Sequence, residues 1–201
     1  MNLQEMEKKL KELEAKVTLQ GDIEQIKQLQ RIYGYYLDCG MKEDVINLFS
    51  DNAESLEVSD YGVFLGKAGV RRFFKGEGKP HPKGNLSLVL QHQGVVHVNP
   101  DGKTAKGRWR GVMIGTRFIK GVPTASWGLG TYENEYIKEN GEWKFKKLHW
   151  NITYRTTYED GWVKNPDVAH IPYEEHGIRG ELPPTAYHPY PSDYYPPLHW
   201  K

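Results

Sequence analysis

Four long runs of strand-forming residues fill the stretch from residue 86 to residue 158, and they constrain the fold more than any other feature of this sequence. The runs cover residues 86–99, 104–117, 124–138 and 143–158. Asn99-Pro100-Asp101-Gly102 and Asn140-Gly141, which join two pairs of runs, are strong signals for hairpin turns. Strands joined by short turns run antiparallel, so the sequence predicts one large sheet built from successive hairpins.

Helical patterns precede these strands. Apolar residues recur at helical spacing from Ile23 to Leu37, and we expect this helix to start at Gly21-Asp22, where Asp22 can form a capping box with Gln25. Shorter helices are expected at residues 43–49 and 67–74, with two short strands at 53–58 and 63–65 around a turn at 59–62. Helices followed by long hairpins predict an α+β fold with the helices on one face of a curved sheet.

Residues 1–20 form a separate amphipathic segment. Apolar side chains repeat there at steps of three and four, with Lys and Glu between them, as in a heptad repeat: Leu3, Met6, Leu10, Leu13 and Val17. About two heptads are marginal as an isolated helix in water. The segment is therefore either a helix lying on its own domain or an arm packing on a neighbouring subunit of a homo-oligomer, a dimer or a trimer.

Residues 159–201 differ in composition from the rest of the chain. They hold most of the twelve prolines together with many aromatic residues. Proline at this density excludes a helix or a central strand, whereas a disordered tail is poor in aromatic residues. We therefore expect an arm at residues 1–20, a domain at 21–158, and an extended tail at 159–201 that docks on the domain or on a partner subunit.

The overall composition excludes several classes of protein. The 27 basic and 26 acidic residues give a net charge of +1, which disfavours nucleic-acid binding. The single cysteine, Cys39, excludes a disulfide framework and a metal site built from thiolates. No apolar run is long enough to span a membrane, and the first residues are too charged for a signal peptide. We expect a soluble cytoplasmic protein that binds neither nucleic acid nor a membrane.

Strand alternation predicts where candidate functional side chains point. In residues 86–99 the even-numbered positions hold three leucines and His92, so His92 is expected on an apolar face, where its imidazole needs a polar partner or a wet cavity. In residues 104–117 the small residues share one face, as if helices approached them closely. Arg108 and Arg110 then point to the other face.

The last strand leaves two alternatives open. Either His149 and Asn151 or Trp150 and Tyr154 face the concave side of the sheet, because successive residues point to opposite faces. A bulge at Lys146-Lys147 would reverse the choice.

Motifs spread over residues 22–157 resemble the SnoaL-like group of the nuclear-transport-factor-2-like superfamily. YGYYLDCGMKEDVINLF contains a tyrosine, Tyr33, followed five residues later by Asp38, and a second helix that ends in Phe. The strand start SDNAESLEV and the helix GKAGVRRFF come next. LQHQGVVHVNPDGKTAKGRW joins a strand histidine to a hairpin, and NGEWKFKKLHW closes the pattern.

The resemblance implies a cone-shaped domain, in which a curved antiparallel sheet wraps around three helices and a deep apolar pocket opens at the wide end. The group is similar to scytalone dehydratase, bile-acid 7α-dehydratase, ketosteroid isomerase and polyketide cyclases. It is also similar to lyases that release formaldehyde from lignin-derived diaryl compounds. These enzymes work without a metal or an organic cofactor, so we expect none here.

The resemblance also implies roles for individual residues. By position, His92 and Asp38 match the pair that acts together in the dehydratases, and Tyr33 matches the tyrosine of the helix. Tyr61, which lies in a turn, is a looser candidate for a second tyrosine that binds the substrate. The further candidates for substrate binding are Arg108, Arg110, His149, Asn151 and Trp127.

The first functional hypothesis is a cofactor-free lyase that acts on a hydroxylated aromatic or polycyclic small molecule. His92 would remove a proton, and a hydroxyl or hydroxymethyl group would leave as water or formaldehyde. The alternatives are an isomerase or polyketide cyclase that uses the same pocket, and a non-catalytic binding or assembly protein. The fourth strand shows no inward aspartate to donate a proton, which disfavours the isomerase.

Overall fold

A curved, unclosed six-stranded sheet forms the body of the protein in the computed structural model, which describes residues 1–76, 83–168 and 170–200. The strands are β1 (Ser55–Val58), β2 (Val63–Leu65), β3 (Ser87–Val98), β4 (Thr104–Ile119), β5 (Val122–Glu139) and β6 (Glu142–Thr157). Their order in the sheet is β2-β1-β6-β5-β4-β3. β1 and β6 run parallel, and the other neighbours run antiparallel. The expected α+β fold is confirmed, with a parallel β1–β6 pair that was not anticipated.

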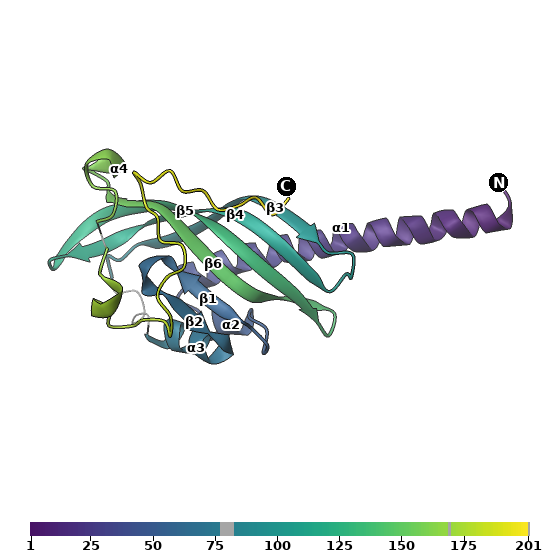
Figure 1. Ribbon diagram of the computed structural model, residues 1–201, viewed down its shortest axis with the longest axis horizontal. Coiled ribbons are helices and arrows are strands. Elements are labelled where there is room, and N and C mark those ends of the chain that lie inside the picture. The colour runs from purple at the N-terminus through teal and green to yellow at the C-terminus, as the bar shows by residue number, and fades with distance from the viewer. Residues whose placement is uncertain (77–82, 169, 201) are drawn as a thin grey trace.

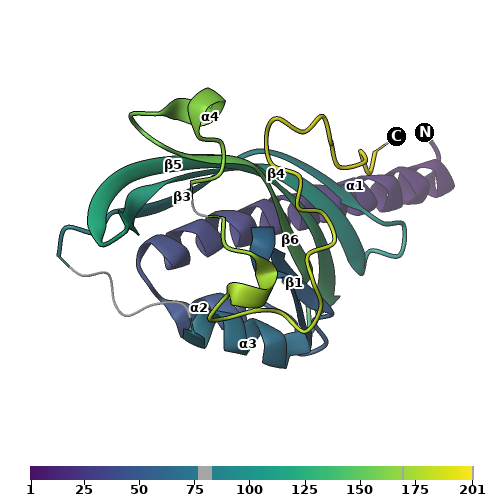
Figure 2. The ribbon, with the colours of Figure 1, turned by 60° about the vertical axis from the view of Figure 1, so that its left-hand side comes forward.

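Helices α1 (Leu3–Asp38), α2 (Lys42–Asn47) and α3 (Gly66–Gly76) lie on the concave side of the sheet, which we call the inner face (Figures 1 and 2). Shorter helical turns are η1 (Ser59–Tyr61), α4 (Gly161–Lys164) and η2 (Tyr173–Glu175). The chain between α4 and η2 runs from one edge of the sheet down toward α3 (Figure 2). Within the described part of the chain, no helix is both long enough and apolar enough to cross a membrane.

The helix α1 continues without interruption through Gly21 and Asp22, so the expected break there is wrong. Asp22 is buried in the middle of the helix, where its Oδ1 accepts hydrogen bonds from Lys138 Nζ at 2.6 Å and Trp143 Nε1 at 2.9 Å. These tertiary contacts override the weak helix propensities of glycine and aspartate. The capping box forms instead at the first turn, between Asn2 and Glu5.

Tight turns connect the long strands as the sequence indicates. Asn140 and Gly141 have φ angles of 51° and 85°, and Lys120 and Gly121 have φ angles of 50° and 82°. Two successive positive φ angles are typical of the two-residue hairpin turns whose twist matches that of the flanking strands. The β4–β5 and β5–β6 hairpins are therefore set locally.

Aromatic side chains of the strands fill the inner face. The buried rings are those of Trp109, Tyr132, Tyr136, Trp143, Phe145 and Trp150. Glycines make room for them, since a Cβ on Gly111 would lie 2.6 Å from the Tyr132 ring and one on Gly130 would lie 2.4 Å from Trp150 Nε1. The small residues of β4 thus accommodate rings from neighbouring strands, whereas helices were expected.

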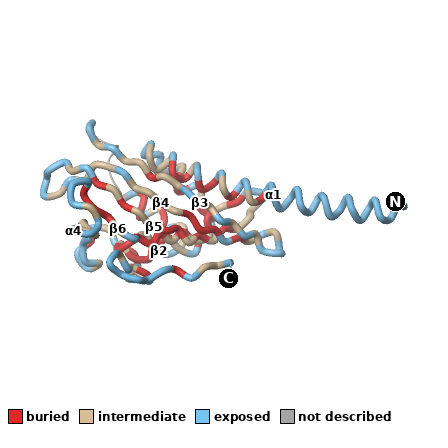
Figure 3. Tube along the Cα trace, turned by 90° about the horizontal axis from the view of Figure 1, so that it is seen from above, coloured by how far each residue is buried: buried red, intermediate tan, exposed pale blue. Residues whose placement is uncertain are grey.

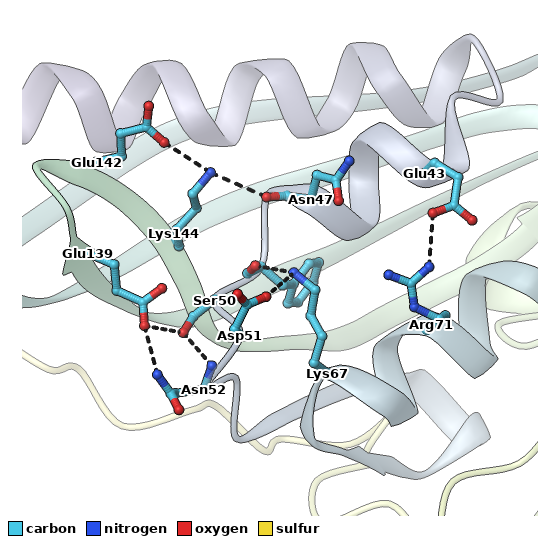
Figure 4. A network of polar contacts seen from close by, with 11 residues as sticks. Glu43, Asn47, Ser50, Asp51, Asn52, Lys67, Arg71, Glu139, Glu142 and Lys144 are labelled. Atoms are coloured by element: carbon cyan, nitrogen blue, oxygen red, sulfur yellow. Dashed lines mark hydrogen bonds and ion pairs between the residues drawn. The ribbon is translucent and has the colours of Figure 1, made fainter.

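A polar network fastens the segment between α2 and β1 to its surroundings (Figure 4). Ser50 Oγ donates a hydrogen bond to Glu139 Oε1 at 2.7 Å and accepts one from the backbone N of Asn52 at 2.8 Å. Lys67, at the start of α3, donates to the carbonyl oxygen of Phe49. The segment therefore links the β5–β6 hairpin to α3.

The tail docks first along β2. The backbone N of Val63 donates to the carbonyl of Leu182 at 2.9 Å, and the two residues form an isolated β-bridge. The carboxylate of Glu57 on β1 then accepts hydrogen bonds from the backbone N and the hydroxyl of Thr185 at 2.6 Å and 2.8–3.0 Å. The tail therefore continues from the edge of the sheet onto its convex side, the outer face.

The end of the tail is held by side chains of the outer face. Arg108 Nη2 donates to the carbonyl oxygens of Pro196 at 2.8 Å and Pro197 at 2.7 Å. Its guanidinium also pairs with Glu133 and lies 5.1 Å from the centroid of the Trp200 ring. Proline cannot donate a backbone hydrogen bond but its carbonyl accepts one, so a donor on the sheet suits a proline-rich ribbon.

Candidate functional site

His92 lies on the outer face of the sheet, so the expectation that it points into an apolar interior is wrong. The side chain is exposed. In the β3–β4 ladder His92 is paired with Arg110, and directly opposed residues of an antiparallel pair project to the same face.

A β-bulge explains the error. The register of β3 shifts between His92 and Val95, and Gln93 within the bulge has a φ of 50°. A bulge adds one residue to a strand and reverses the alternation beyond it. Odd-numbered Gln91 therefore faces inward before the bulge, while even-numbered Val96 packs against the core after it.

Gln91 belongs to a network of neutral groups inside the domain. Its Oε1 accepts a hydrogen bond at 2.8 Å from Gln30 Nε2, and Gln30 Oε1 accepts from Asn134 Nδ2 and Tyr136 Oη, both at 2.9 Å. Burial raises the pKa of neighbouring Tyr132 to about 12. None of these groups accepts a proton near neutral pH, so the network supports structure and offers no catalytic base.

Tyr33 and Asp38 lie on the inner side of the sheet, which separates them from His92. The buried ring of Tyr33 packs edge-on against Tyr132 and Phe145, at centroid distances of 6.1 Å and 5.5 Å. Asp38 Oδ1 accepts a hydrogen bond from the backbone N of Val89 at 2.7 Å. Asp38 therefore joins the end of α1 to β3, and the expected pairing of His92 with Asp38 is wrong.

Two bulges in the β5–β6 ladder decide which residues of β6 face inward. The pairing register shifts at two places, where Lys146 and Thr153 of β6 are the extra, unpaired residues. Trp150 consequently packs in the core, while Asn151 on the outer face is paired with Thr131. Beyond the second bulge Tyr154 lies on the outer face. The alternative in which Trp150 faces inward is therefore correct for Trp150, but wrong for Tyr154, which was expected to face inward with it.

The expected substrate-binding residues other than Tyr61 lie on the outer face. Arg110 Nη1 donates to Thr131 Oγ1 at 3.1 Å, and His149 Nε2 lies 3.4 Å from Glu57 Oε1. Burial lowers the pKa of His149, although the charge of Glu57 opposes that shift. Trp127 packs with Tyr154 and Trp162, at centroid distances of 5.5 Å and 5.6 Å. Arg108 holds the tail.

Two pockets lie between the outer face and the tail. One, of about 250 Å³, is lined by residues that include Arg110, Thr131, Asn151, His188 and Tyr194. The other, of about 300 Å³, is lined by residues that include Lys106, Glu133, His149, Asn151 and His199. They gather three of the expected residues in one region, with side chains of the tail forming the other wall.

A different group of side chains combines acid, base and phenol at short range. We call it the Asp60 cluster, and its members are Asp60, Tyr61, Arg155, Asp167, His170, His176 and Tyr187. Asp60 Oδ2 lies 3.4 Å from His176 Nε2 and 3.3 Å from His170 Nδ1. The side chains of Asp60 and His176 are only 2% and 3% exposed. One carboxylate is therefore buried beside two imidazoles, only one of which is itself buried.

Tyr61 and Arg155 complete the cluster on its domain side. The Tyr61 ring stacks on the His176 ring, with a centroid distance of 4.4 Å and an interplanar angle of 21°. Arg155 is buried, donates to Ser59 Oγ at 3.4 Å and lies 6.0 Å from the centroid of the Trp150 ring. Because Trp150 belongs to the core, Arg155 lies on the inner face.

Asp167 and Tyr187 form the tail side of the cluster. The Tyr187 hydroxyl hydrogen-bonds to Asp167 Oδ2, and the Tyr187 ring stacks on His170 at 5.3 Å. Burial raises the pKa of Asp167, while the Tyr187 hydrogen bond and the charge of Arg155 act in the opposite direction. Burial and the neighbouring Asp167 raise the pKa of Tyr187, so that its phenol stays protonated.

Several buried polar atoms of this cluster have no hydrogen-bond partner among the described residues: Asp60 Oδ1, Arg155 Nε, Asp167 Oδ1 and His176 Nε2. Such atoms are rare in proteins. Within the described part of the chain, no group of three or more His, Cys, Asp or Glu side chains is arranged to hold a metal ion. The cluster is suited to proton transfer by its own side chains.

Sequence reasoning missed Asp60, Arg155 and His176. Tyr61 alone of the cluster was a candidate, because it resembled a family tyrosine. Asp60 in the same turn matched no motif, Arg155 follows the bulge at Thr153, and the other members lie in the tail outside the family pattern. One signal was available: four of the eight histidines (His170, His176, His188 and His199) lie in the tail. Histidines concentrated in an ordered, aromatic-rich segment indicate a contribution to a site.

A family model described as a SnoaL-like domain matches residues 21–149. The chain belongs to the SnoaL-like family. No curated protein matches it. Among solved structures it is similar to one named "putative scytalone dehydratase" from Novosphingobium aromaticivorans, with 19% identity and a TM-score of 0.60 over 78% of this chain and 99% of that chain.

Two further solved structures have the same fold. One, named a hexachlorocyclohexane dehydrochlorinase, has 17% identity and a TM-score of 0.57 over 81% of this chain and 97% of that chain. The other is an NTF2-like protein with a cystatin-like fold from Novosphingobium aromaticivorans, with 18% identity and a TM-score of 0.53 over 81% and 97%. The expected SnoaL-like, NTF2-like fold is confirmed.

Proposed function

We propose that this SnoaL-like protein is a cofactor-independent lyase that acts on a hydroxylated aromatic small molecule, with the Asp60 cluster as its catalytic site. The observation that carries the proposal is the buried Asp60–His176 pair, stacked against Tyr61 and close to the inner-face cation Arg155. An imidazole oriented by a carboxylate takes up and returns a proton near neutral pH.

In this mechanism Asp60 sets the tautomer of His176. The carboxylate oxygen Oδ2 lies 3.4 Å from Nε2 of the imidazole without the geometry of a hydrogen bond, and a small rotation of the ring that forms this bond places the proton on Nε2 and leaves Nδ1 as the proton acceptor. When His176 becomes an imidazolium, the same carboxylate stabilises its charge. Arg155 supplies a donor for an oxygen that gains negative charge in the transition state, since its Nε has no partner among the described residues.

In a dehydration, His176 removes a proton from the carbon next to the one that bears the hydroxyl group. The electron pair of the broken C–H bond forms the new double bond, the C–O bond breaks, and the proton on His176 leaves with the hydroxyl group as water. In a loss of formaldehyde, His176 instead takes the proton of a hydroxymethyl O–H, the C–C bond breaks, and the proton returns to the carbon that keeps the electrons.

Two observations favour an elimination and an aromatic substrate. Two of the similar structures bear the names of a dehydratase and a dehydrochlorinase, and both names describe eliminations. Around the cluster the rings of Tyr61 and Tyr187 stack on His176 and His170, so the imidazoles already lie in aromatic surroundings. The partners that we propose are this substrate and further copies of the same chain.

The test is an assay of the full-length protein on a panel of hydroxylated diaryl compounds with and without a hydroxymethyl group. We expect an unsaturated product or formaldehyde to form without added metal or cofactor. In the His176→Gln variant turnover should fall about 10²- to 10⁴-fold, the usual contribution of a general base.

His92→Gln is the matched control, because it makes the same change at an exposed histidine of the outer face. It should keep full activity. If His92→Gln loses turnover while His176→Gln keeps it, the Asp60 cluster is not the catalytic site. If the product is an isomer of the substrate, the activity is that of an isomerase and the proposed lyase activity is wrong.

A further inference from the structure

The first five turns of α1 extend beyond the sheet with their apolar side chains uncovered. Residues 1–21 are exposed throughout, and the helix projects from the domain (Figures 1 and 3). At about 1.5 Å per residue the projecting part is about 27 Å long. Its apolar stripe, which we call the arm seam, consists of Leu3, Met6, Leu10, Leu13 and Val17, and these side chains are 46–70% exposed.

The domain from which the arm extends cannot cover the arm seam. Farther along the same helix, α1 packs on its own domain through the buried residues Ile26, Leu29 and Tyr33. At about 100° per residue, the direction of those side chains lies about 150° away from that of the arm seam. The seam therefore points away from the domain, which excludes the alternative of a helix resting on its own sheet.

The charges beside the arm seam have an order. With Leu3 and Leu10 at heptad position a and Met6 and Leu13 at d, the flanking g positions hold Lys9 and Lys16 and the e positions hold Glu7 and Glu14. In a parallel pair, g of one helix faces e of the next heptad on its partner, so Lys9 of one arm faces Glu14 of the other. In an antiparallel pair g faces g and e faces e, which sets lysine against lysine and glutamate against glutamate.

From these features we infer that the arms of two or more copies of this chain pair in parallel along the arm seam as a short coiled coil. The occupant of the seam is the same surface of a second copy, because that surface supplies both the matching apolar stripe and the complementary charges. The capping box of Asn2 and Glu5 fixes the free end of each helix. Since the seam and the domain face opposite sides of α1, the paired arms leave both domains room. This inference does not depend on the catalytic role of the Asp60 cluster.

Disulfide crosslinking tests the pairing and its direction. In a Cys39→Ser background, which removes the single native thiol, Met6→Cys places one thiol at a d position, where equivalent residues meet only in a parallel arrangement. We expect mild oxidation to convert most of this variant to covalent dimer. The matched control is Lys8→Cys, whose thiol lies on the far side of the helix and should crosslink at least about tenfold more slowly. Equal rates for the two variants would overturn the proposal.

Charge reversal gives a second, independent readout. By analytical ultracentrifugation the full-length chain should sediment as an oligomer, Lys9→Glu should weaken association about tenfold, and Lys9→Glu with Glu14→Lys should restore it. A monomer at about 100 µM, or no rescue in the double variant, contradicts parallel pairing. A third result would also contradict parallel pairing. If the chain is monomeric and binds phosphatidylglycerol vesicles, and Leu10→Lys abolishes that binding, the arm seam contacts a lipid surface instead of a second copy.

Discussion

The two ends of the chain differ in how they contact the domain. Residues 3–21 form regular helix that leaves the domain with its apolar stripe exposed, whereas the tail, with little regular structure, returns to the domain and hydrogen-bonds to it. A helix satisfies its backbone hydrogen bonds internally, so it can stand away from the fold. An extended proline-rich segment cannot, and it stays ordered only where side chains and strand edges of the domain accept or donate those bonds.

Deleting each end in turn is the most direct test of this difference, and it has the largest expected effect. Deletion of residues 181–201 removes the tail partners of Glu57, Val63 and Arg108, and the five hydrogen bonds lost, at about 1 kcal/mol each, amount to about 5 kcal/mol. We expect the Tm of that variant to fall by about 10 °C. Deletion of residues 1–20 should change the Tm of the dilute protein by less than about 2 °C. Differential scanning calorimetry of the two deletions measures both effects, and similar losses would contradict the contrast.

A pair of identical substitutions within α1 sharpens the comparison. Leu29 is 7% exposed and Leu13 is 58% exposed, although both lie on one continuous helix. We expect Leu29→Ala to lower the free energy of unfolding by about 2–5 kcal/mol, because it leaves a cavity in the core. Leu13→Ala should change it by less than about 0.5 kcal/mol at protein concentrations where the chain is monomeric. Urea unfolding measures both, and a large effect of Leu13→Ala would show that the arm packs on its own domain.

The smallest expected effect is a pH dependence of the docked tail. Burial lowers the pKa of His199 from its ordinary 6.5 to about 4, so the undocked tail binds the proton more readily. Docking should therefore be fully stable above about pH 6.5 and weaken as the pH falls toward about 4. Hydrogen exchange of the amides of residues 198–200 measures this, and His199→Gln should flatten the profile while His188→Gln leaves it unchanged. A profile that persists in His199→Gln assigns the effect to another group.

The strands could be predicted because their signals are local. Alternating residues and the turn at Asn140-Gly141 specify the long hairpins without reference to the rest of the chain. Which face each side chain takes could not be predicted in the same way. One extra residue reverses the alternation, and the bulge in β3 holds Gln93 at a positive φ beside Gly94. An isolated glycine within a strand often marks a bulge, so Gly94 was the one signal available in the sequence. Because of that one extra residue, His92 lies on the outer face and not on the inner face where it was expected.

The remaining errors come from contacts between distant residues. The expected helix break failed because Lys138 and Trp143, far along the chain, bond Asp22 within the helix. The composition of the tail indicated that it docks, yet nothing in it specified that His176 would meet Asp60 or that Pro196 would meet Arg108. Such pairings depend on the finished sheet, which explains why the fold was more predictable than the candidate site.

The clamp on Asp22 has a mechanical consequence. It fixes α1 to two neighbouring strands at the point where the helix leaves the sheet, so the helix beyond it behaves as a stiff rod and not as a tether. Whatever holds the tip of that rod sets the distance and the orientation of the whole domain. The number of helical turns before residue 22 would then set how far the domain stands from that point.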